Sequence, residues 1–95
     1  MSIVVVGGDY LGGIEKNLYA IGVTKLVHIS GRKPLDKKMM KAYKNTAFVL
    51  VMTNFINHGA VKNVKAFAKT NSIPTIFSKR SWVAIEEKLK EHNLI

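Results

Sequence analysis

The sequence predicts a small α/β domain in which four strands alternate with four helices. Short runs rich in β-branched and aliphatic residues recur along the chain, and segments with the apolar period of a helix follow them. Glycine or proline separates several of these segments. Such alternation is typical of a parallel sheet with right-handed crossovers. We therefore expect one Rossmann-like or flavodoxin-like three-layer domain over residues 1–95, with the order β-α-β-α-β-α-β-α and a four-stranded parallel sheet.

The first half of the chain contains two strand–helix pairs. Residues 3–6 form a continuous β-branched run, as in a strand buried on both faces. Residues 14–21 carry apolar side chains with helical spacing, and residues 25–29 predict a second strand. Residues 34–44 predict a helix that begins at a proline. The face of this helix opposite its apolar stripe carries Lys37, Lys41 and Lys44.

The second half repeats the pattern. Residues 47–52 are the most apolar run and predict a central strand. Asn57 can cap the next helix, whose inward residues are Val61, Val64 and Ala68. Residues 73–77 predict a fourth strand, and Pro74 favours an edge position or a strand start. Ser81 can cap the last helix, whose apolar stripe is Trp82, Ile85 and Leu89.

The composition excludes several classes of protein. The chain has no cysteine, so a disulfide scaffold, a cysteine metal site and a cysteine nucleophile are ruled out. No apolar run approaches the roughly 20 residues that a membrane-spanning helix needs. No signal-peptide pattern is present at the start of the sequence. We expect a cytoplasmic protein without a membrane partner.

The charge is strongly basic and unevenly distributed. Fifteen Lys and Arg residues against six Asp and Glu residues give a net charge of +9. Six cations and one acid place +5 of this within residues 31–45. An excess of this size favours an anionic partner, either a nucleotide or a nucleic acid, although a solvated lysine surface is the plainer alternative. The expected nucleic-acid contacts are Lys37, Lys41 and Lys44.

The predicted ligand site lies where the four strands end, because open parallel sheets bind ligands beyond the carboxyl ends of their strands. The four loops there combine glycines, short polar side chains and cations. The candidate binding residues are Gly7, Gly8, Asp9, Gly12 and Gly13 after the first strand, Ser30, Gly31, Arg32 and Lys33 after the second, Thr53, Asn54, Asn57 and His58 after the third, and Ser78, Lys79, Arg80 and Ser81 after the fourth.

Each residue type has a mechanism. Glycines let a ligand approach the backbone, and the following helix offers its positive N-terminal end. Arg32 and Arg80 can grip a phosphate or carboxylate through two hydrogen bonds each. The first loop is neither a dinucleotide fingerprint nor a P-loop, and Asp9 disfavours an anion directly over it. Ordinary turn chemistry and helix capping remain the alternative explanation.

Catalysis has less support than binding. Ser30, Ser78 and Ser81 are possible nucleophiles, but no spacing places them beside a histidine, and no G-x-S-x-G elbow exists. We therefore predict a regulatory binding module rather than an enzyme. One alternative is a haem- or metal-binding protein that uses His58 or His28, although the histidines lack a short ligand spacing. Another is a homodimeric protein-interaction module, because so small a sheet exposes its edges.

Four ordered blocks carry a resemblance to a known family. The blocks are Val4–Gly8, His28–Lys33, Thr53–His58 and Ile76–Trp82. With these blocks the chain resembles the bacterial family called domain of unknown function 2325, over nearly its whole length. The resemblance implies a small cytoplasmic α/β domain and no established reaction. It also implies an association with haem, which would fall on His28 or His58.

Overall fold

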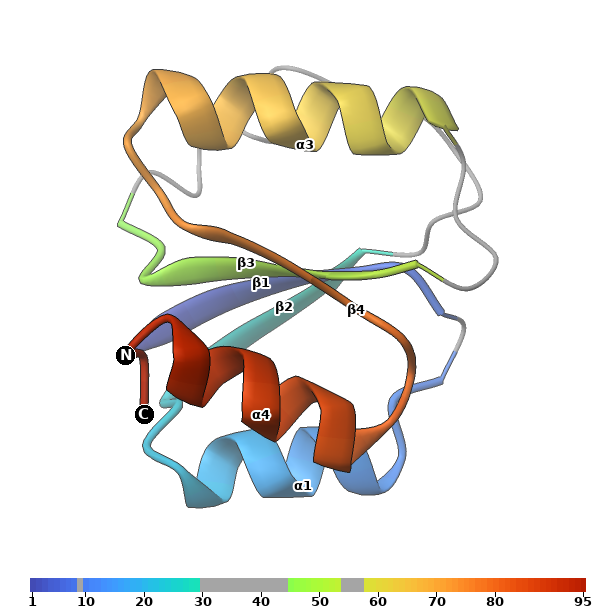
Figure 1. The fold of residues 1–95 in the computed structure, drawn as a ribbon, viewed down its shortest axis with the longest axis vertical. Helices are drawn as coiled ribbons and strands as arrows, with labels where there is room; N and C mark the ends of the chain where they lie inside the picture. Colours follow the sequence, from blue (N-terminus) through green and yellow to red (C-terminus); the bar gives the residue numbers. More distant parts are fainter. Residues whose placement is uncertain (9, 30–44, 54–57) are drawn as a thin grey trace.

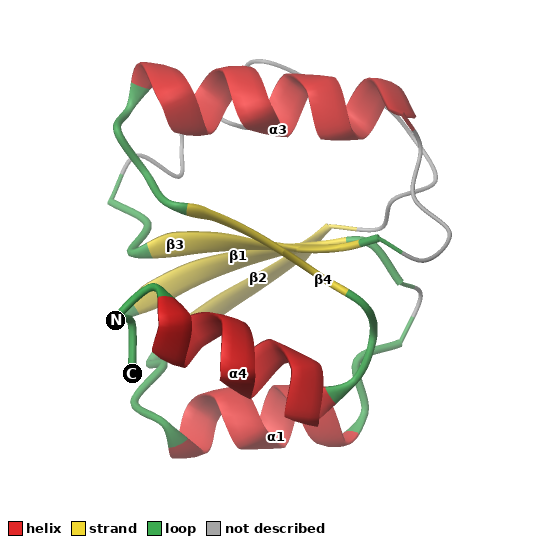
Figure 2. Cartoon of the chain, in the orientation of Figure 1, coloured by secondary structure: helices red, strands yellow, loops and turns green. Residues whose placement is uncertain are grey.

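Four parallel strands form one sheet, and helices lie on both of its faces in this computed structural model (Figure 1). The structure describes residues 1–8, 10–29, 45–53 and 58–95. The strands are β1 (Ser2–Val6), β2 (Lys25–Ile29), β3 (Phe48–Met52) and β4 (Thr75–Ser78). The described helices are α1 (Gly13–Ala20), α3 (His58–Thr70) and α4 (Trp82–Glu91). Helices α1 and α4 cover one face and α3 covers the other, as Figure 2 shows. The predicted α/β class and parallel sheet are confirmed.

The order of the strands in the sheet is β2-β1-β3-β4. The chain moves from β1 outward to β2 and then returns to the other side of β1 to form β3 and β4. This reversal creates a topological switch point between β1 and β3. In doubly wound sheets of this kind, the crevice beyond the strand ends at the switch point is the usual ligand position.

The core forms because β1 and β3 are buried on both faces. Along β1, Ile3 and Val5 pack toward α1 and α4, whereas Val4 and Val6 pack toward α3. All of β3 is buried, as expected for the most apolar run of the sequence. The helices contribute their predicted stripes to these two layers. The buried members are Ile14 and Leu18 of α1, Val64 and Ala68 of α3, and Ile85 and Leu89 of α4.

The boundaries of several elements differ from the sequence prediction by one or two residues, among them β1, which begins at Ser2, and β3, which begins at Phe48. Strand β4 begins at Thr75 rather than at Ile73, and it extends to Ser78. Pro74 has no N–H to donate, but its carbonyl oxygen accepts a hydrogen bond from the Val49 N–H at 2.9 Å. The edge position predicted for this strand is confirmed. Helix α1 begins at Gly13, one residue before its first apolar position.

The predicted helix at 34–44, with Lys37, Lys41 and Lys44, lies outside the described residues. Among the residues that are described, no helix is both long and apolar enough to span a membrane.

Candidate functional site

The carboxyl ends of the four parallel strands lie along one border of the sheet. Hydrogen bonds continue the strand pairing past the strand ends. The Gly7 N–H donates to the Ile29 carbonyl at 2.9 Å, and the Thr53 N–H donates to the Ser78 carbonyl at 2.9 Å. The described helices α1, α3 and α4 all begin at this border (Figure 1). Their positive dipole ends therefore add to the positive charge of Lys79 and Arg80, which makes the border attractive to an anion.

The first loop depends on glycine for its backbone conformation. Gly7, Gly8 and Gly12 have φ values of 101°, 72° and 55°, in the left-handed region that other residues rarely adopt. At Gly7 the neighbouring strand gives a second reason. A Cβ atom there would lie 2.6 Å from the carbonyl oxygen of Met52, at the switch point between β1 and β3. Packing of the chain against itself thus explains Gly7 without a ligand.

The other glycines of this loop differ in how much space surrounds them. A Cβ atom at Gly8 would meet the end of the Met52 side chain at 3.3 Å, and one at Gly12 would meet the Tyr10 ring at the same distance. A Cβ atom at Gly13 would have no neighbour within 4 Å. Gly13 is exposed, has no positive φ and is the first residue of α1. It is therefore the glycine whose missing side chain leaves open space at the start of a helix.

His28 holds the first loop from the adjacent strand β2. Its Nε2 atom lies 2.9 Å from the Gly7 carbonyl oxygen and 3.1 Å from the Gly8 carbonyl oxygen. Both partners can only accept, so Nε2 carries a proton and donates to both. Sequence reasoning proposed His28 as a haem ligand. In the observed arrangement, iron binding through Nε2 would require both of these hydrogen bonds to break.

Arg80 connects the fourth loop to the first. Its Nε donates to the Tyr10 carbonyl oxygen at 3.0 Å, and its Nη2 donates to the same oxygen. The sequence predicted that this guanidinium would grip a ligand through two hydrogen bonds. In the structure, two of its N–H groups bind the backbone instead. The guanidinium nevertheless brings its positive charge to the glycine loop.

The two serines of the fourth loop have different positions. Ser78 is buried, and its hydroxyl donates a hydrogen bond to the Lys79 carbonyl oxygen at 2.9 Å. The Ser78 hydroxyl proton is therefore already used in a bond within the chain. Ser81 is the N-cap residue of α4, as predicted, but its side chain makes no capping hydrogen bond. It is half-buried. Lys79 and Thr53 are exposed at the same border.

Several predicted site residues lie outside the described part of the chain. They are Asp9, Ser30, Gly31, Arg32, Lys33, Asn54 and Asn57. His58 begins α3, but its side chain also lies outside that part. The structure thus brings together the first loop, Thr53 of the third and all four candidates of the fourth. The convergence predicted for the second loop stays a prediction.

Tyr10 is the residue of this border whose role sequence reasoning missed. The candidate binding residues predicted from the sequence do not include it. Its side chain is 75% exposed beside Gly12, and Arg80 binds its carbonyl oxygen. The available signal was an aromatic residue between two glycine pairs, in the loop after the first strand.

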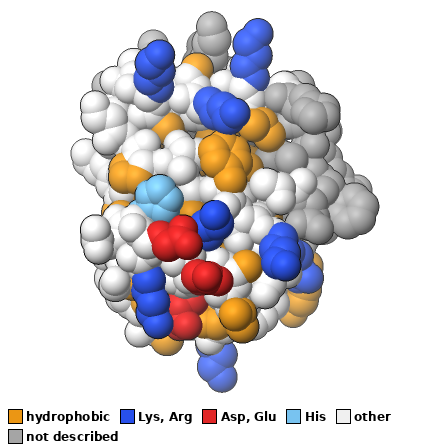
Figure 3. Space-filling view, in the orientation of Figure 1, with side chains coloured by type: hydrophobic (Ala, Val, Ile, Leu, Met, Phe, Trp, Pro, Cys, Tyr) orange, Lys and Arg blue, Asp and Glu red, His pale blue; other side chains and the backbone are white. Residues whose placement is uncertain are grey.

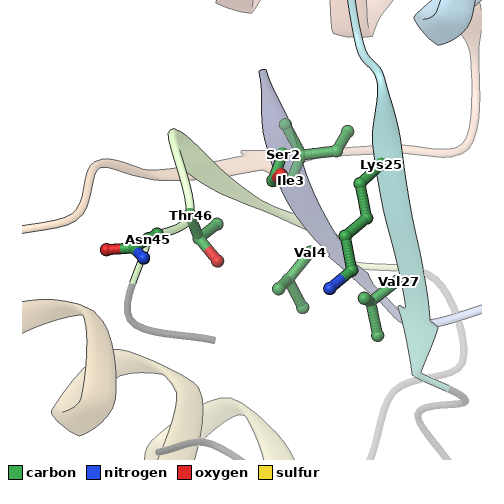
Figure 4. A pocket seen from close by; sticks show the side chains of 7 residues that line it. All are labelled: Ser2, Ile3, Val4, Lys25, Val27, Asn45 and Thr46. Carbon is green, nitrogen blue, oxygen red and sulfur yellow. The ribbon is translucent and has the colours of Figure 1, made fainter. Parts of the chain in front are cut away.

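Two open hollows lie on the described surface, and the second reaches the carboxyl border at Thr53, Ser78 and Lys79. One, of about 220 Å³, is at the amino ends of β1 and β2 (Figure 4). Its lining combines valine and isoleucine with one cation, Lys25, and contains no glycine loop. The other, of about 490 Å³, lies between β4 and α4. Neither coincides with the glycine loop.

The described residues contain no cluster of side chains suited to binding a metal ion. Within them, no group of three His, Asp or Glu side chains is arranged to hold a metal ion. The haem alternative through His58 involves a side chain outside the described part. That alternative stays a prediction.

Comparison with known proteins identifies a family but no activity. No curated protein and no solved structure matches the chain. A family model described as an uncharacterized protein conserved in bacteria (DUF2325) matches residues 2–92. Because this match spans nearly the whole sequence, the chain belongs to the DUF2325 family.

Proposed function

We propose that this protein is a regulatory binding module for a phosphorylated ligand of the nucleotide class, held at the carboxyl border of the sheet. The observation that carries the proposal is the position of the glycine loop at the switch point between β1 and β3. That crevice is where doubly wound sheets place ligands. The loop is followed by open space at Gly13 and by the N-terminal end of α1.

Electrostatics support a phosphate in this position. Three described helices begin at the border, and Lys79 and Arg80 add two positive charges. An anion at a helix start gains from the helix dipole. At α1 the Ile14 and Glu15 N–H groups already donate to the Leu11 and Gly12 carbonyl oxygens, so the dipole and the cations carry the attraction there, against the charge of Glu15 in the first turn. Lys79 is exposed and can turn toward a phosphate. Arg80 acts mainly by holding the loop, because it binds the Tyr10 carbonyl oxygen.

The exposed Tyr10 ring supports a nucleotide over a bare phosphate. Aromatic rings stack on bases, and each stacked base contributes about 1–3 kcal/mol by alanine substitution. The ring lies beside Gly12, within the same loop that leads to the start of α1. A nucleotide can therefore place its base on Tyr10 and its phosphate near Gly13.

Binding without chemistry fits the polar groups that can be placed. The Ser78 hydroxyl donates to the Lys79 carbonyl, and His28 Nε2 donates to Gly7 and Gly8. Both groups therefore stabilise the loops. A serine–histidine pair for nucleophilic catalysis would require both to leave these partners.

A thermal-unfolding screen with a panel of nucleotides tests the proposal. A nucleotide at 100 times its dissociation constant should stabilise the protein by about 2.7 kcal/mol. Gly13→Glu should abolish this gain because it places a side chain and a negative charge in the open space, whereas Gly13→Ala should keep it. Tyr10→Ala should weaken binding about tenfold, and Tyr19→Ala, at an exposed tyrosine of α1, should not. A panel that leaves the wild-type melting temperature unchanged would refute the proposal.

The salt dependence of binding distinguishes a nucleotide ligand from a nucleic-acid ligand. Nucleic-acid binding through several phosphates loses affinity steeply as salt increases, in proportion to the number of phosphate contacts. A small nucleotide should show a much shallower dependence. Measuring the dissociation constant at several salt concentrations therefore decides which anion the border accepts.

A further inference from the structure

Strand β4 offers unpaired main-chain groups along its outer side. In the described part of the chain it pairs with β3 and has no strand on the other side. Pro74 and Ser78 turn their carbonyl groups toward β3. Because successive residues of a strand alternate, Thr75 and Phe77 turn their N–H and C=O groups outward. In Figure 1 this strand passes in front of the others, and no described helix lies across it.

A groove lies beside the carboxyl end of β4, on the α4 side. The hollow of about 490 Å³ has a lining of mixed charge. It is bounded by Thr53, Phe77, Ser78 and Lys79 at the strand ends and by Ala84, Glu87, Lys88 and Glu91 of α4. Small Ala84 keeps the groove open next to the strand. An extended chain laid along β4 therefore has room for the side chains that point to the α4 face.

The other face of the same edge is positively charged and partly aromatic. Lys65 of α3 places its Nζ atom 5.2 Å from the centre of the Phe77 ring. Lys62 and Lys69 are exposed on the same helix, which contains no acidic residue. Figure 3 looks onto this side of the molecule and shows Lys and Arg side chains over α3, with the acidic side chains below, toward α4. The α3 side of the β4 edge therefore favours acidic side chains.

We propose that β4 accepts an extended acidic segment of a partner protein as a fifth strand, whose acidic side chains face α3. Strand addition to a sheet edge uses the main-chain groups for affinity and alternate side chains for specificity. The expected segment alternates Asp or Glu, facing Lys65 and its neighbours, with small apolar residues, facing the groove at Ala84. The groove shares Lys79 with the carboxyl border, but the proposal rests on the outer side of β4 and on Lys65 rather than on the glycine loop, so it does not depend on the proposed function.

The charges favour this occupant over a second copy of the chain. Two copies that paired antiparallel through β4 would be related by an axis perpendicular to the sheet, so α3 would approach α3. Lys62, Lys65 and Lys69 of both copies would then lie on the same side of the joint sheet without acidic residues from α3 to offset them. Like charges placed opposite each other disfavour that pairing.

Peptide titration of the full chain, followed by amide NMR and fluorescence anisotropy, tests the proposal. The probe is a labelled seven-residue peptide that alternates Glu with Val. We expect it to shift and protect the amides of Thr75 and Phe77, while a peptide that alternates Lys with Val does not bind. A Glu–Val peptide with N-methylated backbone amides should lose binding, since it cannot complete the strand ladder.

Matched protein variants distinguish binding of the peptide at the β4 edge from general attraction of an acidic peptide to a basic protein. Lys65→Gln should weaken binding of the Glu–Val peptide roughly three- to fivefold, whereas Lys16→Gln on α1 should leave it unchanged. Equal binding of a scrambled peptide or of the N-methylated peptide would overturn the proposal. So would amide shifts confined to residues 7–13, or sedimentation showing that β4 pairs with a second copy instead.

Discussion

At the scale of single residues, two glycines of the same loop have opposite roles. Gly7 has a φ of 101°, and a Cβ atom there would approach the Met52 carbonyl oxygen to 2.6 Å. Gly13 has open space around it and begins α1. The sequence identified both as candidate ligand contacts, because a glycine pair in a strand-to-helix turn does not reveal its neighbours. The requirement at Gly7 comes from β3, which is distant along the chain, so only the folded structure could reveal it.

We predict that Gly7→Ala lowers the free energy of unfolding by about 2–4 kcal/mol. The left-handed conformation costs roughly 1–2 kcal/mol for a residue with a Cβ atom, and the contact with a backbone oxygen adds to this cost. Gly13→Ala serves as the control and should raise stability by roughly 0.5 kcal/mol. Denaturant unfolding of both variants measures the difference. Equal stability of the two would contradict this reading of the loop.

At the scale of elements, Arg80 ties the β4–α4 connection to the loop between β1 and α1. The sequence predicted the position of Arg80 at the strand ends, but it predicted a ligand as the partner. Hydrogen bonding to the Tyr10 carbonyl depends on how far the two loops approach, which sequence periodicity does not specify. The same limit applies to Ser81, whose N-cap position was predicted while its missing side-chain bond was not.

We predict that Arg80→Ala loosens the glycine loop while the sheet stays intact. Both hydrogen bonds to Tyr10 are lost, and because Arg80 is exposed the global stability should fall by less than about 1 kcal/mol. Hydrogen exchange should become faster at the Ile14 and Glu15 amides, which donate to the Leu11 and Gly12 carbonyl oxygens, but not at those of β3. Lys79→Ala, at the neighbouring exposed lysine, is the control. Unchanged exchange in the loop of the Arg80 variant would show that this contact does not hold it.

At the scale of the whole molecule, the architecture was predictable and the ligand was not. Alternating apolar runs and helical stripes such as Val64 and Ala68 predicted a parallel sheet with helices, and rules of chain connection then limited its topology. The border site predicted from that topology stays a prediction. The hydrogen bonds of His28 and Arg80 could not be predicted from the sequence. Both side chains bind backbone carbonyl groups whose positions sequence patterns do not specify.

The net charge of +9 leads to a prediction for the whole chain. The ion pairs Lys88–Glu91 and Lys90–Glu86 are exposed on α4 and contribute little, so repulsion among cations should dominate the response to salt. Raising sodium chloride from about 10 mM to about 150 mM should therefore raise the melting temperature, because screening weakens that repulsion. A decrease would show that attractive ion pairs govern stability instead.

Phosphate at the same ionic strength separates screening from binding at the border. If the starts of the helices accept an anion, phosphate should raise the melting temperature beyond chloride, and Gly13→Glu should lose only this additional part. The variant should keep the chloride response, since it leaves most of the positive charge in place. Phosphate is also excluded from protein surfaces and stabilises proteins without binding a site. If exclusion alone acts, phosphate should raise the melting temperatures of the wild type and of Gly13→Glu by the same amount. That outcome would contradict anion binding at the carboxyl border of the sheet.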